Sequence, residues 1–198
     1  MSIHINNLYK SYSKLVVLKG IDYTFKDHTK YIIKGENGAG KSTLIKAILN
    51  QIKYDGVIET NDKISYCPDA SLMLSFMSLE SFIRTFSSLT ENVPNLDDEM
   101  DKLLEYFDII KYKKSYLGSL SKGQRQKANI ISSLLTPSSF VIMDEPLSGL
   151  DTESQKKLVD LILKDDRAFI IISHETDLFK TDKFIYLGIV DGNIKVLP

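Results

Sequence analysis

At residues 35–42 the chain reads Gly35-Glu36-Asn37-Gly38-Ala39-Gly40-Lys41-Ser42. This stretch matches the pattern G-x-x-x-x-G-K-[ST], in which glycines let backbone N–H groups turn inward around phosphate oxygens. In that pattern Lys41 reaches the β- and γ-phosphates and the Ser42 hydroxyl ligates Mg²⁺. An apolar strand precedes the stretch and a helical pattern over residues 42–50 follows it, with its positive end toward the same anion. The sequence therefore predicts a nucleotide phosphate site.

A second motif ends an apolar strand later in the chain, where Asp144 and Glu145 follow residues 140–143. A carboxylate at such a strand end can hold Mg²⁺ through water, and the second carboxylate can polarise or orient an attacking water. Pro146 also permits a plainer interpretation, a helix start without chemistry. The phosphate loop upstream favours the catalytic interpretation.

The remaining pattern predicts an α/β fold with a mainly parallel sheet, because buried apolar strands alternate with helices. Gly20 separates two of the expected N-terminal strands, and Asp191-Gly192 is a hairpin-turn dipeptide. A helix is expected over residues 153–163. Strands are expected at residues 3–8, 15–18, 21–25, 31–34, 140–143, 168–172, 184–187 and 194–196.

Residues 71–135 are mostly helical in pattern and predict an insertion in this core. Pro94 separates two helices, and Asn95 is expected to cap the second. We therefore expect a single domain, 1–198, in which residues 1–70 and 136–198 form a P-loop core with an N-terminal antiparallel β portion and residues 71–135 form a helical subdomain. The first helix shows one apolar face, formed by Leu79, Phe82, Ile83 and Phe86.

The composition excludes several classes of protein. The 198 residues carry a formal net charge of −1, and no basic excess points to nucleic acid. Cys67 is the one cysteine, so no internal disulfide can form, and a buried filler is the expected role. No apolar run approaches the about 20 residues that span a bilayer, and the N-terminus has no apolar signal core. Any membrane-spanning part is expected in another chain.

Between the two phosphate-site motifs the chain reads Leu120-Ser121-Lys122-Gly123-Gln124. With the motif order, this stretch resembles the signature L-S-G-G-Q of the nucleotide-binding subunits of ATP-binding cassette (ABC) transporters. Lys122 replaces the first glycine of the signature. The resemblance covers nearly the whole chain: Ser148-Gly149-Leu150-Asp151 resembles the D-loop, His174 the switch histidine, and Tyr12 the aromatic residue on which adenine stacks.

The resemblance implies an ATPase that uses ATP and Mg²⁺ and works as a head-to-tail pair. Glu145 and His174 would be catalytic. Mg²⁺ would be held by Ser42 and Asp144, with Asp69 as a further candidate, and Asp151 would act at the dimer interface. The implied ATP-binding residues are Tyr12, Gly35, Glu36, Asn37, Gly38, Ala39, Gly40, Lys41, Ser42 and Thr43, with Ser121, Gly123 and Gln124 acting on the ATP of the other copy.

Several positions keep a plainer interpretation. Tyr9 and Tyr23 are rivals to Tyr12, Ser121 alone is an ordinary helix cap, and Asp151 is one too, although capping and interface roles can coexist. Lys122 is compatible with an anion site if its side chain points outward.

Asp69 stands where the family usually has a glutamine. An acid there could bind Mg²⁺ more directly or repel the γ-phosphate without Mg²⁺, or be a tolerated loop residue. The segment Leu72-Met73-Leu74-Ser75-Phe76-Met77 is apolar and rich in methionine. In the family this region forms a groove for a helix of the membrane subunit, and core packing is the alternative.

The expected function is ATP hydrolysis that powers transport, with a bacterial exporter suggested by the short chain. The expected partners are a separate transmembrane permease subunit and a second copy or a homologous subunit, with no nucleic acid, at the cytoplasmic face of the membrane. A non-transport ABC ATPase acting on DNA or ribosomes is the alternative, although such proteins usually carry a coiled-coil insertion or two cassettes. A kinase or GTPase and a module that does not hydrolyse ATP are further alternatives; the chain has no Asn-Lys pair for guanine recognition.

Overall fold

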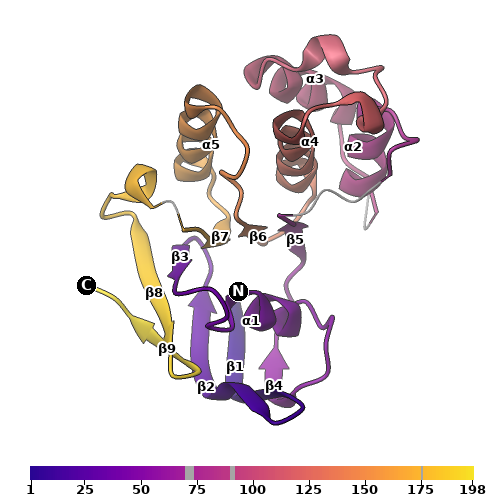
Figure 1. Ribbon diagram of the computed structural model, residues 1–198. Helices are drawn as coiled ribbons and strands as arrows, with labels where there is room; N and C mark the ends of the chain where they lie inside the picture. Colours follow the sequence, from indigo (N-terminus) through magenta and orange to yellow (C-terminus); the bar gives the residue numbers. More distant parts are fainter. Residues whose placement is uncertain (70–73, 90–91, 175) are drawn as a thin grey trace.

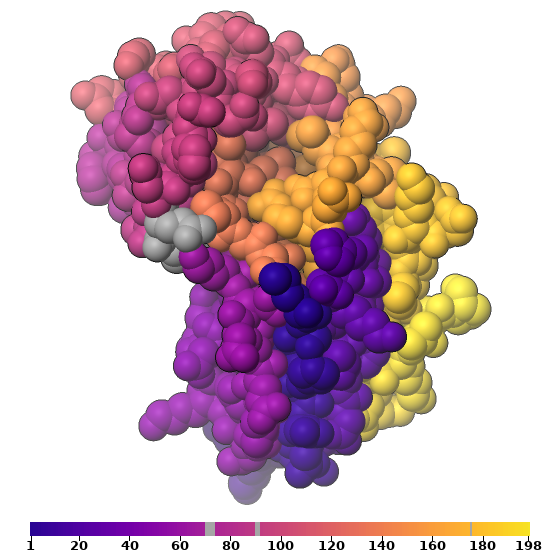
Figure 2. Space-filling view, turned by 180° about the vertical axis from the view of Figure 1, so that it is seen from behind, coloured from indigo at the N-terminus to yellow at the C-terminus, as the bar shows by residue number. Residues whose placement is uncertain are grey.

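The computed structural model describes residues 1–69, 74–89, 92–174 and 176–198. Within them, two β-sheets and a block of helices are stacked along the molecule (Figure 1). The helices of residues 79–135 gather at one end, and the N-terminal antiparallel strands lie at the opposite end. Seen from behind, the pink and magenta helical block forms a lobe above the indigo and purple strands (Figure 2).

The larger sheet has six strands in the order β5-β6-β7-β3-β8-β9. Pairing is parallel from β5 to β8, and β8 and β9 form an antiparallel hairpin. Both hairpin-turn residues, Asp191 and Gly192, have positive φ, which confirms the turn predicted there. The mainly parallel sheet is confirmed. Its strands are β3 (Lys30–Lys34), β5 (Ile64–Cys67), β6 (Phe140–Asp144), β7 (Ala168–Ile172), β8 (Phe184–Val190) and β9 (Asn193–Val196).

The smaller sheet is antiparallel, with the order β2-β1-β4: β1 (Ser2–Tyr12), β2 (Leu15–Lys26) and β4 (Asp55–Glu59). The prediction of two strands on either side of Gly20 is wrong, because β2 is continuous. Leu8 pairs with Ile21 and Tyr9 with Lys19, so Gly20 is the extra residue of a bulge, at φ +75°. Strand β4 was not predicted; it is short, contains a glycine and is mostly exposed.

The helical block lies in sequence between β5 and β6 and contains α2 (Leu79–Ser87), α3 (Leu96–Tyr106) and α4 (Lys122–Leu135). The predicted apolar face of α2 is confirmed, with Phe86 half-buried. Asn95 precedes α3 as predicted, but its backbone is left-handed and its side chain makes no capping hydrogen bond. The remaining helical elements are α1 (Lys41–Ile48), α5 (Thr152–Lys164) and the 3₁₀ turns η1 (Ile110–Tyr112), η2 (Leu117–Ser119) and η3 (Asp177–Phe179).

The core has two parts, one on each face of the larger sheet. In β7, Phe169 and Ile171 face the part that includes α2–α5, and Ile170 and Ile172 face the part that includes α1 and the antiparallel sheet. Strands buried on both faces explain the continuous apolar runs in the sequence. Cys67 is fully buried, as predicted, and burial raises its pKa to about 12.

Candidate functional site

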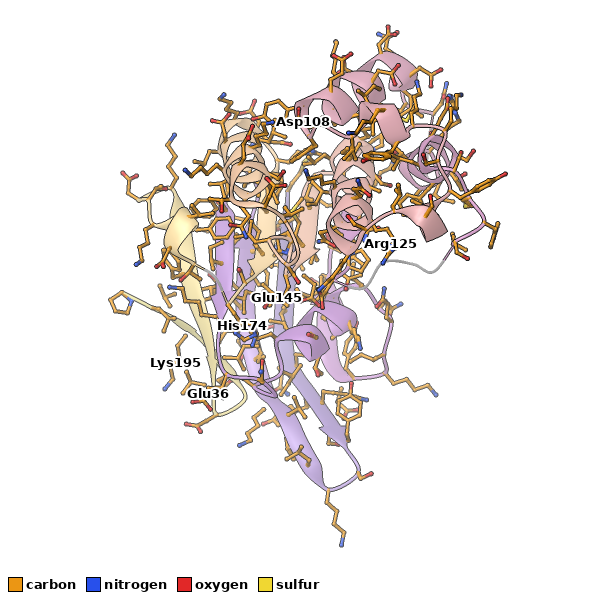
Figure 3. The ribbon with its side chains drawn as sticks, turned by 45° about the horizontal axis from the view of Figure 1, so that its top comes forward. Glu36, Asp108, Arg125, Glu145, His174 and Lys195 are labelled. Carbon is orange, nitrogen blue, oxygen red and sulfur yellow. The ribbon has the colours of Figure 1, made fainter. Side chains whose placement is uncertain are left out.

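The carboxyl ends of three neighbouring parallel strands bring the predicted motifs to one edge of the larger sheet. Strand β3 leads into the phosphate loop, β6 ends at Asp144, and β7 is followed by His174. Ligands of open α/β sheets bind outside this edge. Figure 3 shows Glu145 and His174 near one another at this level, between the helices and the antiparallel strands.

The phosphate loop has the backbone geometry of an anion site. Gly38 and Gly40 have φ angles of +83° and +106°, a backbone conformation that residues with a Cβ rarely adopt. Gly40 is the N-cap of α1 and offers no side-chain cap, and the first turn of α1 contains no acidic residue. The first N–H groups of α1 therefore lack a side-chain acceptor and carry the positive end of the helix dipole.

Lys41 is nearly buried, and its Nζ donates to the carbonyl oxygens of Gly35 at 2.7 Å and Glu36 at 3.0 Å. The ammonium group is thereby held inside the loop rather than extended into solvent. Phosphate oxygens entering the loop would offer it charged acceptors, which make stronger hydrogen bonds than carbonyl oxygens do.

Oxygen ligands for a hard cation converge opposite the loop. Ser42, Asp144 and Asp69 line the same depression. Burial raises the pKa of Asp144 above its ordinary value, and the charge of Asp69 adds to the rise. Hydroxyl and carboxylate oxygens suit Mg²⁺, which binds proteins through one or two carboxylates and keeps several waters. In the described ranges no cluster of three or more His, Cys, Asp or Glu is arranged to hold a metal.

Glu145 and His174 are in direct contact. The backbone N–H of His174 donates to Glu145 Oε2 at 3.2 Å, and Nε2 of its ring lies 3.3 Å from Oε1. Among the described residues Oε1 is enclosed and accepts no hydrogen bond. Burial raises the pKa of Glu145, and the contacts with His174 oppose that rise. Glu145 also lines the depression that Asp69 faces, where a carboxylate can orient or deprotonate an attacking water.

These groups surround one depression of about 540 Å³. It brings together most of the predicted site residues. Gly35, Glu36 and Ala39 line the adjacent depression instead, on the other side of the loop. Val17 and Ile172 also line the site, although neither belongs to a motif that the sequence analysis identified. The predicted residues in the depression are Tyr12, Asn37, Gly38, Gly40, Lys41, Ser42, Thr43, Asp69, Asp144, Glu145 and His174.

Tyr12 is the candidate for adenine stacking that the geometry favours. Its ring is about half exposed, lines the depression, and lies 4.8 Å from Lys10 Nζ. Tyr9 packs beside the bulge at Gly20. Tyr23 packs edge-on against Phe25, and burial raises its pKa to about 12.

The signature stretch lies elsewhere, at the start of α4, and lines a separate depression of about 500 Å³. Ser121 and Gln124 form a capping box, in which the Ser121 hydroxyl accepts from Gln124 N and Gln124 Oε1 accepts from Ser121 N. Asp151 caps α5 by accepting from Ser154 N at 2.9 Å and also pairs with Lys127 at 3.1 Å. The helix-cap interpretations of Ser121 and Asp151 are therefore confirmed as local structure.

Lys122 does not simply point outward, as the sequence interpretation required. Its Nζ donates to Ser148 Oγ at 3.1 Å, and its methylene groups lie against Gly149. Gly123 approaches the same loop so closely that an added Cβ would stand 2.4 Å from the Gly149 carbonyl oxygen.

The apolar segment after Asp69 is only partly packed in the core, and its predicted role as a groove stays a prediction. Leu72 and Met73 lie outside the described residues. Leu74 and Met77 pack partly buried against the core, whereas the Phe76 side chain is 73% exposed. Over the described ranges no helix has the length and apolar content to cross a membrane.

Comparisons with known proteins show which family the chain resembles. A family model described as "ABC transporter" matches residues 18–148. An uncharacterized ABC transporter ATP-binding protein of Methanocaldococcus jannaschii is 32% identical over 86% of this chain and 67% of its own length. A zinc import ATP-binding protein of Rickettsia bellii is 30% identical over 91% of this chain and 78% of its own length. A solved ATP-binding subunit of an ABC transporter has the same fold, with a TM-score of 0.90 and 21% identity over the whole of this chain and 90% of that one.

The chain therefore belongs to the ABC transporter family. Within the family it is an ATP-binding subunit, whose activity is ATP hydrolysis coupled to transport. The predicted P-loop α/β fold is confirmed. The prediction of an exporter has no support, since the relatives named for a transport direction are importers, the zinc protein among them.

Proposed function

We propose that two copies of this chain, or one copy and a homologous subunit, associate head to tail around two ATP molecules and drive a separate transmembrane permease. The observation that carries this proposal is the separation of the two depressions. The depression at the phosphate loop and the depression at the signature are lined by different residues of one chain. Each chain would then carry one half of each of two nucleotide sites, and a second copy in the reverse orientation would complete both sites.

At the phosphate loop, the proposed ATP-binding groups are the backbone N–H groups of residues 37–43, Lys41 and the ring of Tyr12. Ser42 and Asp144 are proposed to hold Mg²⁺, with Asp69 beside them. Bound there, Mg²⁺ would neutralise charge on the phosphate oxygens. The partner copy would contribute Ser121, Gly123 and Gln124 from the start of its α4.

Glu145 is the proposed general base. Glu145 lines the phosphate-loop depression, and burial favours proton uptake by raising its pKa. His174 holds the carboxylate by its backbone N–H, and its ring lies within reach of the same group. Phosphoryl transfer depends mainly on positioning and electrostatics, so these contacts matter through the geometry that they fix.

Glu145→Gln tests the proposal because it preserves shape and removes the base. We expect the loss of hydrolysis, by about 100-fold or more, together with a stable dimer in the presence of ATP and Mg²⁺. Phosphate release and analytical ultracentrifugation measure the two outcomes, and Glu59→Gln on the exposed surface of β4 is the matched control. Hydrolysis by Glu145→Gln at the wild-type rate would refute the role of Glu145. A wild-type rate that rises only linearly with protein concentration while the dimer is scarce would refute the pairing.

The chain is proposed to lie at the inner face of the membrane through its permease. The relatives include a zinc import protein, and the short chain alone gives no argument for export. Purification of the chain from membranes with its bound permease identifies the transport system and its direction. Recovery with ribosomes or DNA and without a permease would support the non-transport alternative.

A further inference from the structure

Lys122 connects two parts of the chain that the sequence places far apart. It is the first residue of α4, within the signature stretch, and its side chain crosses to the loop before α5. There its Nζ donates to Ser148 Oγ at 3.1 Å. A Cβ built on Gly149 would lie 3.4–3.6 Å from the Lys122 methylene carbons, so the stem of Lys122 runs beside this glycine. The charged end of Lys122 is therefore bonded to this loop, and its stem lies alongside it.

The same loop is attached to the proposed catalytic carboxylate. The backbone N–H of Ser148 donates to the carbonyl oxygen of Glu145 at 3.0 Å. Glu145 has a left-handed backbone, at φ +47°, which is uncommon for a residue with a side chain. Its backbone N–H donates to Ile172 O at 2.9 Å, and its carboxylate meets His174. The conformation at Glu145 is thus fixed from the strand on one side and from Ser148 on the other.

A continuous set of contacts results: signature, Lys122, Ser148, Glu145 and His174. The packing of Gly123 on Gly149 and the ion pair of Lys127 with Asp151 run beside it and hold α4 to the same loop. Lys122 differs from these two contacts in one respect. Its long side chain and neutral acceptor allow the ammonium group to be redirected without moving the backbone of α4.

We propose that Lys122 is a positioning residue for ATP hydrolysis, which couples the signature segment to the turn that carries Glu145 in the same chain. The inference rests on the proposed head-to-tail pairing, in which the signature serves the partner's nucleotide and Glu145 serves the chain's own. Lys122 then links the two nucleotide sites through a single side chain. Neither Lys122 nor Ser148 lines the phosphate-loop depression, so the effect falls on turnover and not on nucleotide binding by one copy.

A double-mutant cycle tests the coupling. Lys122→Met keeps the stem and removes the donor, and Ser148→Ala removes the acceptor. We expect each variant to lower kcat by roughly three- to tenfold, as for the loss of one hydrogen bond from a charged donor. The double variant should be no slower than the slower single variant, because both changes break the same contact. ATP affinity of the isolated chain, measured by calorimetry, should stay within about twofold of wild type.

Two further variants separate coupling from general damage. Lys122→Arg retains a donor and should keep kcat within about threefold of wild type. Lys102→Met changes an exposed lysine of the same helical block, which pairs with Glu99, and should leave kcat unchanged. Wild-type kcat in Lys122→Met, losses that multiply in the double variant, or a fall in Tm with kcat unaltered would each overturn the proposal. A linear dependence of the wild-type rate on protein concentration would instead refute the pairing on which it rests.

Discussion

Gly123→Ala adds one methyl group at a place where the structure has no room for it. The new Cβ would stand 2.4 Å from the carbonyl oxygen of Gly149, and real Cβ contacts do not fall below about 3.0 Å. At least about 0.6 Å of movement is therefore needed between α4 and the loop. The obstacle is backbone, which cannot swing aside as a long side chain does. Gln126 and Lys127 also bind α4 to the adjoining residues Pro146 and Asp151, which resists the movement.

Two opposing free energies set the sign of the effect. Alanine in a helix is favoured over glycine by about 1 kcal/mol, and Gly123 has no left-handed backbone that would oppose the change. Overpacking costs about 1–3 kcal/mol, and the short distance to a fixed oxygen places this case near the upper end. The net expectation is a loss of about 2 kcal/mol in the free energy of unfolding. For a chain of this size, that lowers Tm by about 4–8 °C.

Urea denaturation followed by circular dichroism measures the difference. Gly118→Ala is the matched control, because its Cβ would stand 3.1 Å from Ser75 Cβ and 3.2 Å from Ser75 O, which is tight but longer than the 2.4 Å at Gly123. We expect Gly123→Ala to be the more destabilised of the two. If Gly123→Ala were as stable as wild type, the loop would yield at little cost, and the argument that close packing holds α4 against the loop would fail.

The remaining predictions concern two carboxylates. Asp151→Ala should lower stability by about 1 kcal/mol through the lost cap of α5, as measured by urea denaturation. Hydrogen bonds from Ser154 and the nearby Lys127 hold the pKa of Asp151 below its ordinary value. The contribution of Asp151 to stability is therefore complete above about pH 4 and is lost as the pH falls further. An unchanged difference in unfolding free energy between wild type and variant at pH 2.5 would contradict this. Asp69→Gln should strengthen ATP binding without Mg²⁺ by roughly three- to tenfold and flatten its Mg²⁺ dependence, as measured by calorimetry; identical Mg²⁺ titrations of the two proteins would show a tolerated loop residue.

Local patterns in the sequence predict much of the fold. The apolar runs at residues 140–143 and 168–172 are buried on both faces, and this produces a pattern that a single sequence reveals. The predicted break at Gly20 is wrong because a glycine within a strand and a glycine between strands give the same local pattern until the partner strand is known. Strand β4 escaped prediction since its side chains are mostly exposed and give no apolar alternation.

The site likewise has parts that local sequence predicts and parts that depend on the fold. The phosphate loop is contiguous, so its geometry follows from its own residues, whereas the meeting of Glu145 with His174 depends on the order of β6 and β7 in the sheet. The position of Lys122 could not be predicted, because Ser148 lies 26 residues away and is reached only through the packing of α4 on the loop. The sequence interpretation considered Lys122 only as a replacement for glycine, acceptable if its side chain points outward, and gave it no partner of its own.

The charges of the phosphate-loop depression give the two departures from the family pattern a common meaning. One depression is lined by the carboxylates of Asp69, Asp144 and Glu145. Lys41 lines it as well, and its ammonium is already hydrogen-bonded to carbonyl oxygens of the loop. Burial raises the pKa of both Asp144 and Glu145, so ionised carboxylates are unfavourable there, and a triphosphate alone would add like charge. These charges support the proposal that the site accepts ATP together with a cation, and the Asp69→Gln titration above tests whether Asp69 makes that requirement stricter than a glutamine would. Lys122 acts on the same depression in the proposal above, because its ammonium donates to Ser148 Oγ and the Ser148 N–H donates to the carbonyl oxygen of Glu145. Both departures from the family pattern would therefore affect one nucleotide site, Asp69 from its lining and Lys122 through the position of Glu145.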